Sequence, residues 1–167
     1  MNQTQDRFPD NRGSVTTKGS DPADSMTEVR VNPKAAGRVA SGHPWIFASD
    51  ITDRDGAQPG QAVKVLDHRS RPLGTAHYSS ASQISLRMLS NQVEEIDREF
   101  YLHRLRAADE HRRRVVRDSE AYRVTHGEAD RLPALVVDRY GDYLVIQTLS
   151  QGMDAAKADI VSCLEEL

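Results

Sequence analysis

The sequence predicts an α+β protein in which a small, tightly curled β-barrel is followed by an incomplete α/β domain made of a long helix, three strands and a C-terminal helix. Three observations support this prediction. Residues 28–91 contain several short apolar runs separated by turn formers, a spacing typical of a small barrel. Residues 97–117 carry an apolar stripe at helical spacing, and residues 134–149 contain two apolar runs joined by a glycine-containing turn.

Length and composition are those of a globular chain with one or two small domains: 167 residues, of which 38% are hydrophobic and 28% charged. No window approaches the roughly 18–20 apolar residues that a membrane span requires, and the N-terminus lacks the apolar core of a signal peptide. We therefore expect a cytoplasmic protein without a membrane partner. The single cysteine, Cys163, excludes an internal disulfide and a thiolate zinc cluster, and its expected role is packing.

Residues 1–27 are predicted to be a disordered polar tail, because they contain almost no apolar side chains. Acidic residues outnumber basic ones in this part of the chain, so the tail is poorly suited to contact RNA. The net charge of the whole chain is −3, which does not by itself indicate a nucleic-acid-binding protein. Although the net charge is negative, arginines are clustered in the remainder of the chain.

The predicted barrel domain spans residues 28–92. Residues 28–31 alternate polar and apolar side chains, as a half-buried strand does. Asn32 is a favourable helix N-cap and Pro33 a favourable first helical residue, while Gly42 lies where a C-terminal glycine belongs. These signals predict a short helix from Pro33 to about Ser41.

Two basic residues of this helix, Lys34 and Arg38, lie one helical step apart on the same face. They are either two solvated charges or a clamp for phosphate. The helix is followed by a Gly-His-Pro turn and by three large apolar side chains, residues 45–47, which include the only tryptophan. This run is predicted to pack in the core rather than to contact a ligand, whereas His43 lies at the exposed corner of the turn.

Three further strands complete the predicted barrel. They are expected at residues 62–66, 73–78 and 84–89, and each is bounded by turn-forming residues. Residues 53–60 are a cluster of such turn formers. Arg87 lies on the last of these strands.

The second domain is predicted to span residues 93–167 and to begin with one long helix, from Asp97 to about Arg117. This helix carries seven arginines, three of which are consecutive: Arg112, Arg113 and Arg114. The run is either a solvated helix end, favoured by the helix dipole and partly neutralised by nearby acids, or a contact for an RNA backbone.

Three strands and a second helix follow the long helix. The strands are predicted at residues 121–125, 134–138 and 143–149, with a polar loop over residues 126–133 and a short turn between the last two strands. Residues 154–167 have a helical pattern that runs to the last residue without glycine or proline. We therefore expect the domain to be truncated.

The sequence contains no evident catalytic, cofactor-binding or metal-ligating motif. His126 and Glu128 have the spacing of one half of a zinc deaminase site, but the two cysteines of the other half are missing. The chain has no closely spaced histidine pair, no nucleophile elbow and no phosphate-binding P-loop. No glycine-rich loop follows a strand in the way that a nucleotide cofactor requires. The residues alone therefore indicate an α+β protein with no visible catalytic apparatus.

Several segments resemble a known family. They are S-G-H-P-W-I-F at residues 41–47, G-T-A-H-Y at residues 74–78, S-Q-I-S-L-R-M-L at residues 82–89, and the long signature at residues 122–147, which includes G-E-A-D-R-L-P-A-L-V-V-D-R-Y-G-D. They resemble the N-terminal portion of the class I S-adenosylmethionine (SAM)-dependent methyltransferases that modify carbon 5 of cytosine in large-subunit rRNA. The likeness covers about residues 29–167, and its second half is the more specific.

The resemblance implies a first domain of the PUA type, a small pseudo-barrel that binds RNA, and a central α/β domain that leads into a Rossmann-like methyltransferase domain. The cofactor loop, the Asp-Pro-Pro motif and the cysteine nucleophile of that last domain are absent from this sequence, and Cys163 matches none of them. The resemblance therefore implies the targeting part of an rRNA-processing enzyme. It implies SAM as the cofactor of the full-length family member and no cofactor on this chain.

This chain departs from the family pattern at two positions of the polar loop. The family often has glycine where this chain has Arg131 and Ala134. A side chain at either position would cost about 1–2 kcal/mol if the backbone there has a positive φ. Arg131 also adds a positive charge, which is either solvated or attractive to phosphate.

The resulting hypothesis is recognition of large-subunit rRNA through its shape and backbone. The candidate RNA-binding residues come from the first helix, the neighbouring strand edge and the arginine run: Lys34, Arg38, His43, Arg87, Arg112, Arg113 and Arg114. The alternative is a free-standing RNA- or protein-interaction module without catalysis, in which the arginine-rich helix docks an acidic partner. Neither hypothesis specifies an oligomeric state.

Overall fold

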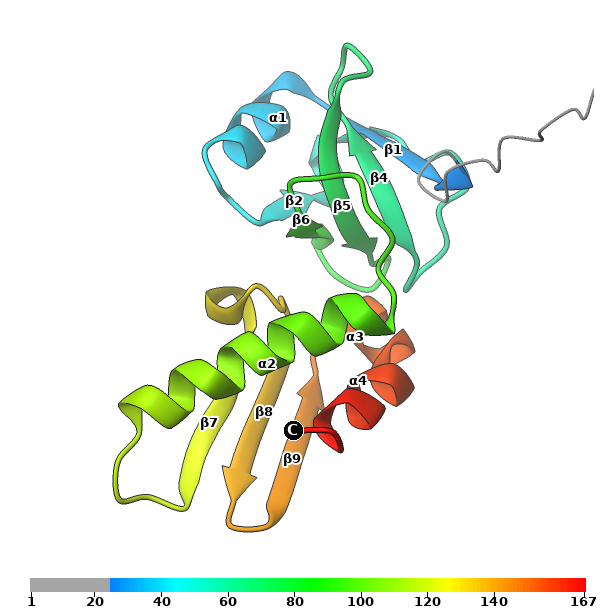
Figure 1. Ribbon diagram of the computed structural model, residues 1–167. Coiled ribbons are helices and arrows are strands. Elements are labelled where there is room, and N and C mark those ends of the chain that lie inside the picture. The colour runs from blue at the N-terminus through cyan, green and yellow to red at the C-terminus, as the bar shows by residue number, and fades with distance from the viewer. Residues whose placement is uncertain (1–24) are drawn as a thin grey trace, which may run out of the picture.

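The computed structural model describes residues 25–167 (Figure 1). Most of the predicted polar tail, residues 1–24, lies outside the described residues. The described chain contains two β-sheets, one of six strands and one of three, each accompanied by helices. The predicted α+β class is confirmed, with a curled sheet followed by a smaller mixed unit.

The first sheet curls into a barrel and has the strand order β2-β6-β5-β4-β1-β3. Its strands are β1 (Glu28–Val31), β2 (Trp45–Phe47), β3 (Ile51–Asp53), β4 (Ala62–Leu66), β5 (Pro72–Tyr78) and β6 (Ile84–Ser90). β1 and β4 are parallel, whereas the other neighbouring strands are antiparallel. The sequence pattern does not predict β2 and β3, which lie at the two edges of the sheet.

The inward-pointing side chains of alternate strand residues form one apolar cluster inside the barrel. Both valines of β1 and both valines of β4 point inward and have no exposed surface. The helix α1 (Pro33–Ala40) packs on this cluster through Ala35, which is also fully buried. As predicted, Asn32 caps α1, because its side chain accepts a hydrogen bond from the N–H of Ala35 at 2.8 Å. A 3-10 turn, η2 (Ala48–Asp50), links β2 to β3.

The second sheet has the strand order β7-β8-β9 and is entirely antiparallel. Its strands are β7 (Ala121–His126), β8 (Leu135–Tyr140) and β9 (Tyr143–Thr148), and a 3-10 turn, η3 (Gly127–Asp130), follows β7. The long helix α2 (Arg98–Val115) crosses one face of this sheet, and α4 (Lys157–Leu164) packs beside it (Figure 1). Leu105, Leu135 and Ile160 are fully buried in the core that these elements enclose.

The C-terminal segment differs from the single helix predicted over residues 154–167. It contains two short helices, α3 (Gln151–Ala155) and α4, with a break at Ala156. α3 begins earlier than predicted because Ser150 caps it through its side chain, whereas Asp154 lies inside the helix rather than at its start.

The barrel and the second unit meet through α3. Gly152 of α3 lies so close to the His77 ring of β5 that a Cβ at this glycine would be 2.2 Å from the ring. The Nε2 atom of His77 is 3.1 Å from the hydroxyl of Tyr101 in α2. The Oε1 atom of Gln151 accepts hydrogen bonds from the Ser79 hydroxyl at 3.0 Å and from the Ser80 N–H at 2.9 Å. Side chains far apart in the sequence therefore fix the two units against each other.

Cys163 of α4 is fully buried, which confirms its predicted packing role. Burial raises the pKa of its thiol, and the sulfur lies 3.4 Å from the carbonyl oxygen of Arg98. Within residues 25–167, no helix is long and apolar enough to cross a membrane. The same part of the chain contains no group of three or more histidine, cysteine, aspartate or glutamate side chains placed to hold a metal ion.

Candidate nucleic-acid interface

A groove with a volume of about 570 Å³ lies at the junction of the barrel and the second unit. The turn after α1, the end of β6 and the loop before β8 form its walls. The residues lining it include His43, Pro44, Met88, Glu128, Arg131 and Pro133. Apolar side chains and a few polar groups therefore converge in one concave region, as is usual for binding sites.

Trp45 lies beside this groove and joins its two sides. Its Nε1 donates a hydrogen bond to Oε1 of Glu128 at 2.7 Å, and the His43 ring packs edge-on against the indole with 5.8 Å between centroids. The prediction that residues 45–47 pack in the core is wrong for Trp45 and Phe47, which are partly exposed, and correct for Ile46, which is fully buried. The reason is that β2 is an edge strand, whose side chains alternate between the interior and the surface.

Arg87 of β6 is the residue opposite Trp45 in the pairing of β2 with β6. Its side chain is half-buried and donates a hydrogen bond to the carbonyl oxygen of Ile84 at 3.0 Å. Burial lowers the pKa of Arg87 from its ordinary value, and the nearby carboxylate of Glu128 opposes this shift. The structure therefore brings two of the predicted residues, His43 and Arg87, to the same tryptophan.

The two basic residues of α1 have different surroundings. Lys34 is exposed and forms no hydrogen bond or ion pair through its side chain with residues 25–167. Arg38 forms an ion pair with Asp50, and its guanidinium lies 5.4 Å from the centroid of the Phe47 ring. Burial alone would raise the pKa of Asp50, but hydrogen bonds from Arg38 and Asn32 outweigh it and lower that pKa. The positive charge of Arg38 is therefore partly neutralised by Asp50, whereas the charge of Lys34 is free to attract a ligand phosphate.

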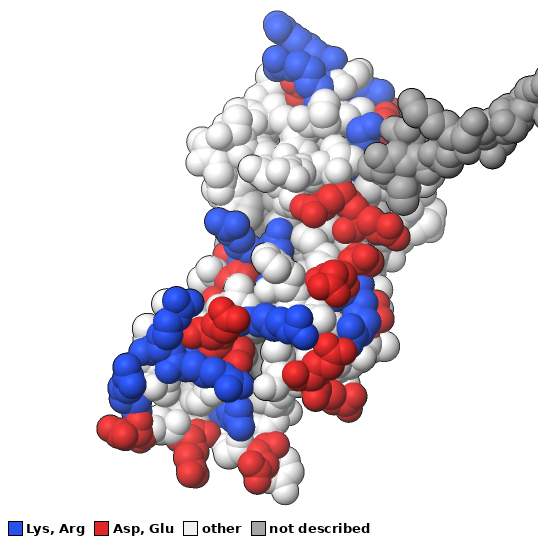
Figure 2. Space-filling model, in the orientation of Figure 1, with Lys and Arg blue, Asp and Glu red and all other residues white. Residues whose placement is uncertain are grey.

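The three consecutive arginines lie in the last turn of α2, at the end of the helix farther from the barrel, where Figure 2 shows a concentration of basic side chains. Arg112 pairs with Asp130 at 2.7 Å, Arg113 pairs with Asp109 at 2.5 Å, and Arg114 donates a hydrogen bond to a backbone carbonyl of its own helix. Arg113 and Arg114 are exposed. The structure does not place these three residues at the groove.

A second cavity of about 790 Å³ adjoins the groove, and Arg131 lines both. Arg104 of α2 donates a hydrogen bond to the Arg131 carbonyl and lies 4.1 Å from the centroid of the Phe100 ring. Glu94 and Glu95 line the same cavity, so its charge is mixed. Arg131 stands out in the sequence because the resemblance leads one to expect glycine at this position. Arg104 does not, because nothing in the pattern separates it from the other helical arginines.

Comparison with protein families matches residues 29–91 to a PUA-like domain. Among curated proteins, the chain is 39% identical over 127 residues to ribosomal RNA large subunit methyltransferase I of Erwinia tasmaniensis. It is 35% identical over 127 residues to the protein of the same name from Salmonella gallinarum. Each alignment covers 74% of this chain and 32% of the relative. The chain thus spans about a third of the length of the curated relatives that it matches.

Two solved structures resemble the fold of this chain, each with a TM-score of 0.75 and 17% sequence identity. One is described as a methyltransferase complexed with SAH, and the other is assigned as a SAM-dependent methyltransferase from Streptococcus mutans. Both cover 84% of this chain, and the chain covers 37% and 38% of theirs. At this level of identity the likeness concerns the fold alone. The sequence comparisons show that the chain carries a PUA-like domain and is homologous to about a third of ribosomal RNA large subunit methyltransferase I.

Proposed function

We propose that this chain is the RNA-binding, substrate-targeting N-terminal part of a SAM-dependent methyltransferase that modifies carbon 5 of a cytosine in large-subunit rRNA. The observation that carries the proposal is the groove beside Trp45: His43, Glu128 and Arg131 line it, and the Trp45 indole contacts both His43 and Glu128. One wall of this groove belongs to the PUA-like domain, residues 29–91. The name of the relatives supports the substrate class. The proposal places the protein in the cytoplasm, where bacterial large-subunit rRNA is made.

RNA would be held mainly through its backbone. Lys34 on α1 and Arg87 beside the groove supply positive charge for phosphates, while the rings of His43 and Trp45 offer a surface on which an unstacked base can pack. Arg38 adds a guanidinium that is already shared with an internal carboxylate. We propose the arginine run at the end of α2, residues 112–114, as a set of secondary backbone contacts.

SAM would supply the electrophilic methyl group of the reaction. A nucleoside cofactor is commonly bound at an open turn between a strand and the following helix. In this chain the first turn of α3, just after β9, packs against the His77 ring so closely that there is no space even for a Cβ at Gly152. That turn does not fit SAM, and we assign no step of methyl transfer to residues of this chain. We propose that the chemistry belongs to the part of the full-length relatives that this chain does not span.

The test is a titration of the 167-residue chain with a labelled fragment of large-subunit rRNA at several salt concentrations. We expect Lys34→Ala to weaken binding and to reduce the salt dependence by about one counterion, because one phosphate contact is lost. The matched control is Lys157→Ala, which removes a lysine of α4 that pairs with Asp154, and it should change neither quantity. A wild-type chain that does not bind rRNA, or that binds it independently of salt, would show the proposal to be wrong.

A second measurement tests where the chemistry resides. The 167-residue chain incubated with rRNA and labelled SAM should leave the RNA unlabelled, whereas a full-length relative should label it. Incorporation of label by the chain alone would contradict the assignment of methyl transfer to another part of the enzyme.

A further inference from the structure

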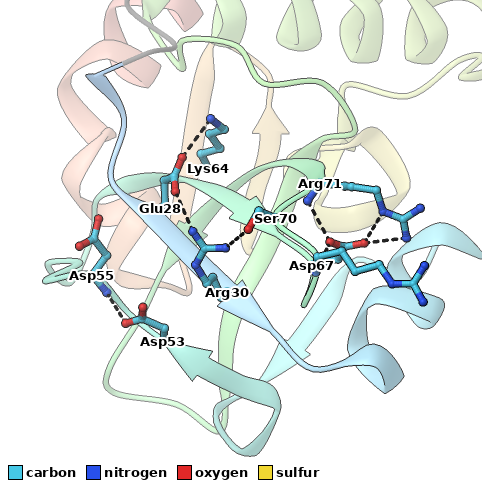
Figure 3. Close-up of polar contacts among 9 residues, drawn as sticks. Glu28, Arg30, Asp53, Asp55, Lys64, Asp67, Ser70 and Arg71 are labelled. Atoms are coloured by element: carbon cyan, nitrogen blue, oxygen red, sulfur yellow. Dashed lines mark hydrogen bonds and ion pairs between the residues drawn. The ribbon is translucent and has the colours of Figure 1, made fainter.

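The turn between β4 and β5, residues 67–71, is a rigid loop at one end of the barrel (Figure 3). The buried carboxylate of Asp67 accepts hydrogen bonds from the N–H groups of Arg69 at 2.8 Å and Arg71 at 2.9 Å, and from Nε of Arg71 at 2.8 Å. The pKa of Asp67 is lowered to about 2, chiefly by the hydrogen bond from the Arg71 N–H. The Asp67 N–H in turn donates to the Arg71 carbonyl at 2.9 Å. The shape of the loop is therefore set before any ligand binds.

A second set of contacts braces this loop from β1. Arg30 donates a hydrogen bond to the Ser70 hydroxyl, and Ser70 itself has a positive φ of 60°. Glu28 pairs with both Arg30 at 3.4 Å and Lys64 at 3.1 Å (Figure 3). One carboxylate is thus shared between two cations, and the surface beside the loop keeps an excess of positive charge.

The loop presents its basic side chains to solvent. Residues 68–72 are all exposed, and the Arg69 side chain forms no hydrogen bond or ion pair with the described part of the chain. The Arg71 side chain is 68% exposed although it pairs with Asp67. Figure 2 shows Lys and Arg gathered at this end of the barrel. Two further acids drawn in Figure 3 lie at and just after the end of β3: the Asp53 carboxylate accepts the N–H of Asp55.

We propose that this loop, the cationic tip (residues 67–71), is a second phosphate-binding site for RNA, separate from the groove beside Trp45. A guanidinium offers paired donors that match phosphate oxygens, and a loop already held by its own hydrogen bonds loses little conformational entropy when it binds. RNA fits better than an acidic protein because the tip and one wall of the groove belong to the same PUA-like domain. The inference rests on the RNA-binding function proposed above and names a further contact for it.

The test compares two arginine variants of the full chain. Arg69→Ala removes an exposed guanidinium of the cationic tip, and Arg54→Ala removes an exposed arginine from the loop after β3, so both change the net charge equally. Binding of a labelled large-subunit rRNA fragment is titrated at several salt concentrations. We expect Arg69→Ala to weaken binding about threefold to tenfold and to reduce the salt slope by about one, and Arg54→Ala to do neither. Arg69→Lys should restore most of the affinity, because it keeps the charge.

The outcomes separate this inference from the proposed function. If the wild-type chain binds rRNA and Arg69→Ala behaves like Arg54→Ala, the cationic tip is not a phosphate site, while the proposed function stands. If the wild-type chain binds no rRNA, both are wrong. Poly-glutamate is the probe for an acidic protein partner: if Arg69→Ala loses poly-glutamate binding but keeps rRNA binding, the inference is overturned. Unchanged thermal unfolding of Arg69→Ala checks that the loop remains folded.

Discussion

Two residues beside the groove have a backbone conformation that L-amino acids rarely adopt. Arg131 has a φ of 58° and Ala134 a φ of 65°, both in the left-handed region. These are the two positions at which the resemblance leads one to expect glycine, and a side chain there costs about 1–2 kcal/mol. Strain of this kind is often retained at functional sites. It lies here in the loop that lines both the groove and the neighbouring cavity.

Replacing Ala134 with glycine should stabilise the protein. Relief of the positive φ outweighs the extra entropy of glycine in the unfolded chain, so we expect the free energy of unfolding to rise by about 0.5–1 kcal/mol. Urea denaturation measures the change. The control is Ala107→Gly at an exposed position within α2, which should lower the free energy of unfolding by about 1 kcal/mol. Equal losses in both variants would show that Ala134 is not strained.

His77 should make stability depend on pH. Burial lowers its pKa from 6.5 to about 4, so the folded protein holds this ring neutral while the unfolded chain protonates it between these values. The free energy of unfolding therefore keeps its full value above about pH 6.5 and falls as the pH decreases toward 4. The loss reaches about 2 kcal/mol by pH 5. Denaturant titrations at pH 7 and pH 5 measure this loss. His77→Asn should remove it, whereas His68→Asn, at an exposed site, should retain it.

At the scale of elements, the sequence predicts most of the fold because local signals agree with the tertiary structure. Asn32 and Asp97 both cap the helices that follow them, and β4 has the predicted bounds. The C-terminal helix is misplaced because two cap residues compete within four positions, and Ser150 rather than Asp154 starts the helix. Edge strand β2 is missed because three consecutive large apolar residues carry no alternation to reveal that only Ile46 faces inward.

The candidate site is less predictable than the fold. His43 and Arg87 are singled out by the sequence and do meet at Trp45, since strand pairing brings β2 beside β6. The partner of that tryptophan, Glu128, lies 83 positions away in the chain, and no local pattern connects them. The partial neutralisation of Arg38 by Asp50 likewise depends on a contact across the barrel rather than on helical spacing.

The Ser150 cap at the start of α3 should contribute to the stability of the protein. Ser150→Ala removes the side chain that accepts the N–H of Met153 at 3.3 Å, and we expect the free energy of unfolding to fall by about 1 kcal/mol. Ser150→Asp should retain the cap, because a carboxylate can accept the same hydrogen bond. The comparison is Ser49→Ala, at an exposed serine in η2. A loss no greater than that of the Ser49 variant, measured by urea denaturation, would exclude the cap as a source of stability.

At the scale of the whole molecule, the barrel and the second unit are held as one body by contacts from several elements. Trp45 pairs with Glu128 on one side of the junction, and Gln151 binds the turn after β5 on the other. Between them, His77 meets Tyr101 in a buried contact, and Leu89 of β6 belongs to the core of the second unit. The groove therefore has walls of fixed relative position.

Gly152→Ala should disrupt this junction. The added Cβ would lie 2.2 Å from the His77 ring, so the ring or α3 must move, and we expect a loss of about 2–3 kcal/mol in the free energy of unfolding. We expect calorimetry to show one transition for the wild type and a broadened or divided transition for Gly152→Ala, because the two units then unfold less cooperatively. Gly37→Ala in α1 is the matched control, because its Cβ meets nothing within 4 Å, and it should be neutral or stabilising. A wild-type profile for Gly152→Ala would contradict the tight junction.

The position of Trp45 gives the molecule an internal optical reporter. It is the only tryptophan in the chain, and its indole is hydrogen-bonded across the junction beside the groove. A base that packs in the groove should quench or shift the emission of this ring, whereas a phosphate bound only at the cationic tip should leave the emission unchanged. A fluorescence titration of the unlabelled chain can therefore distinguish filling of the groove from contact at the tip.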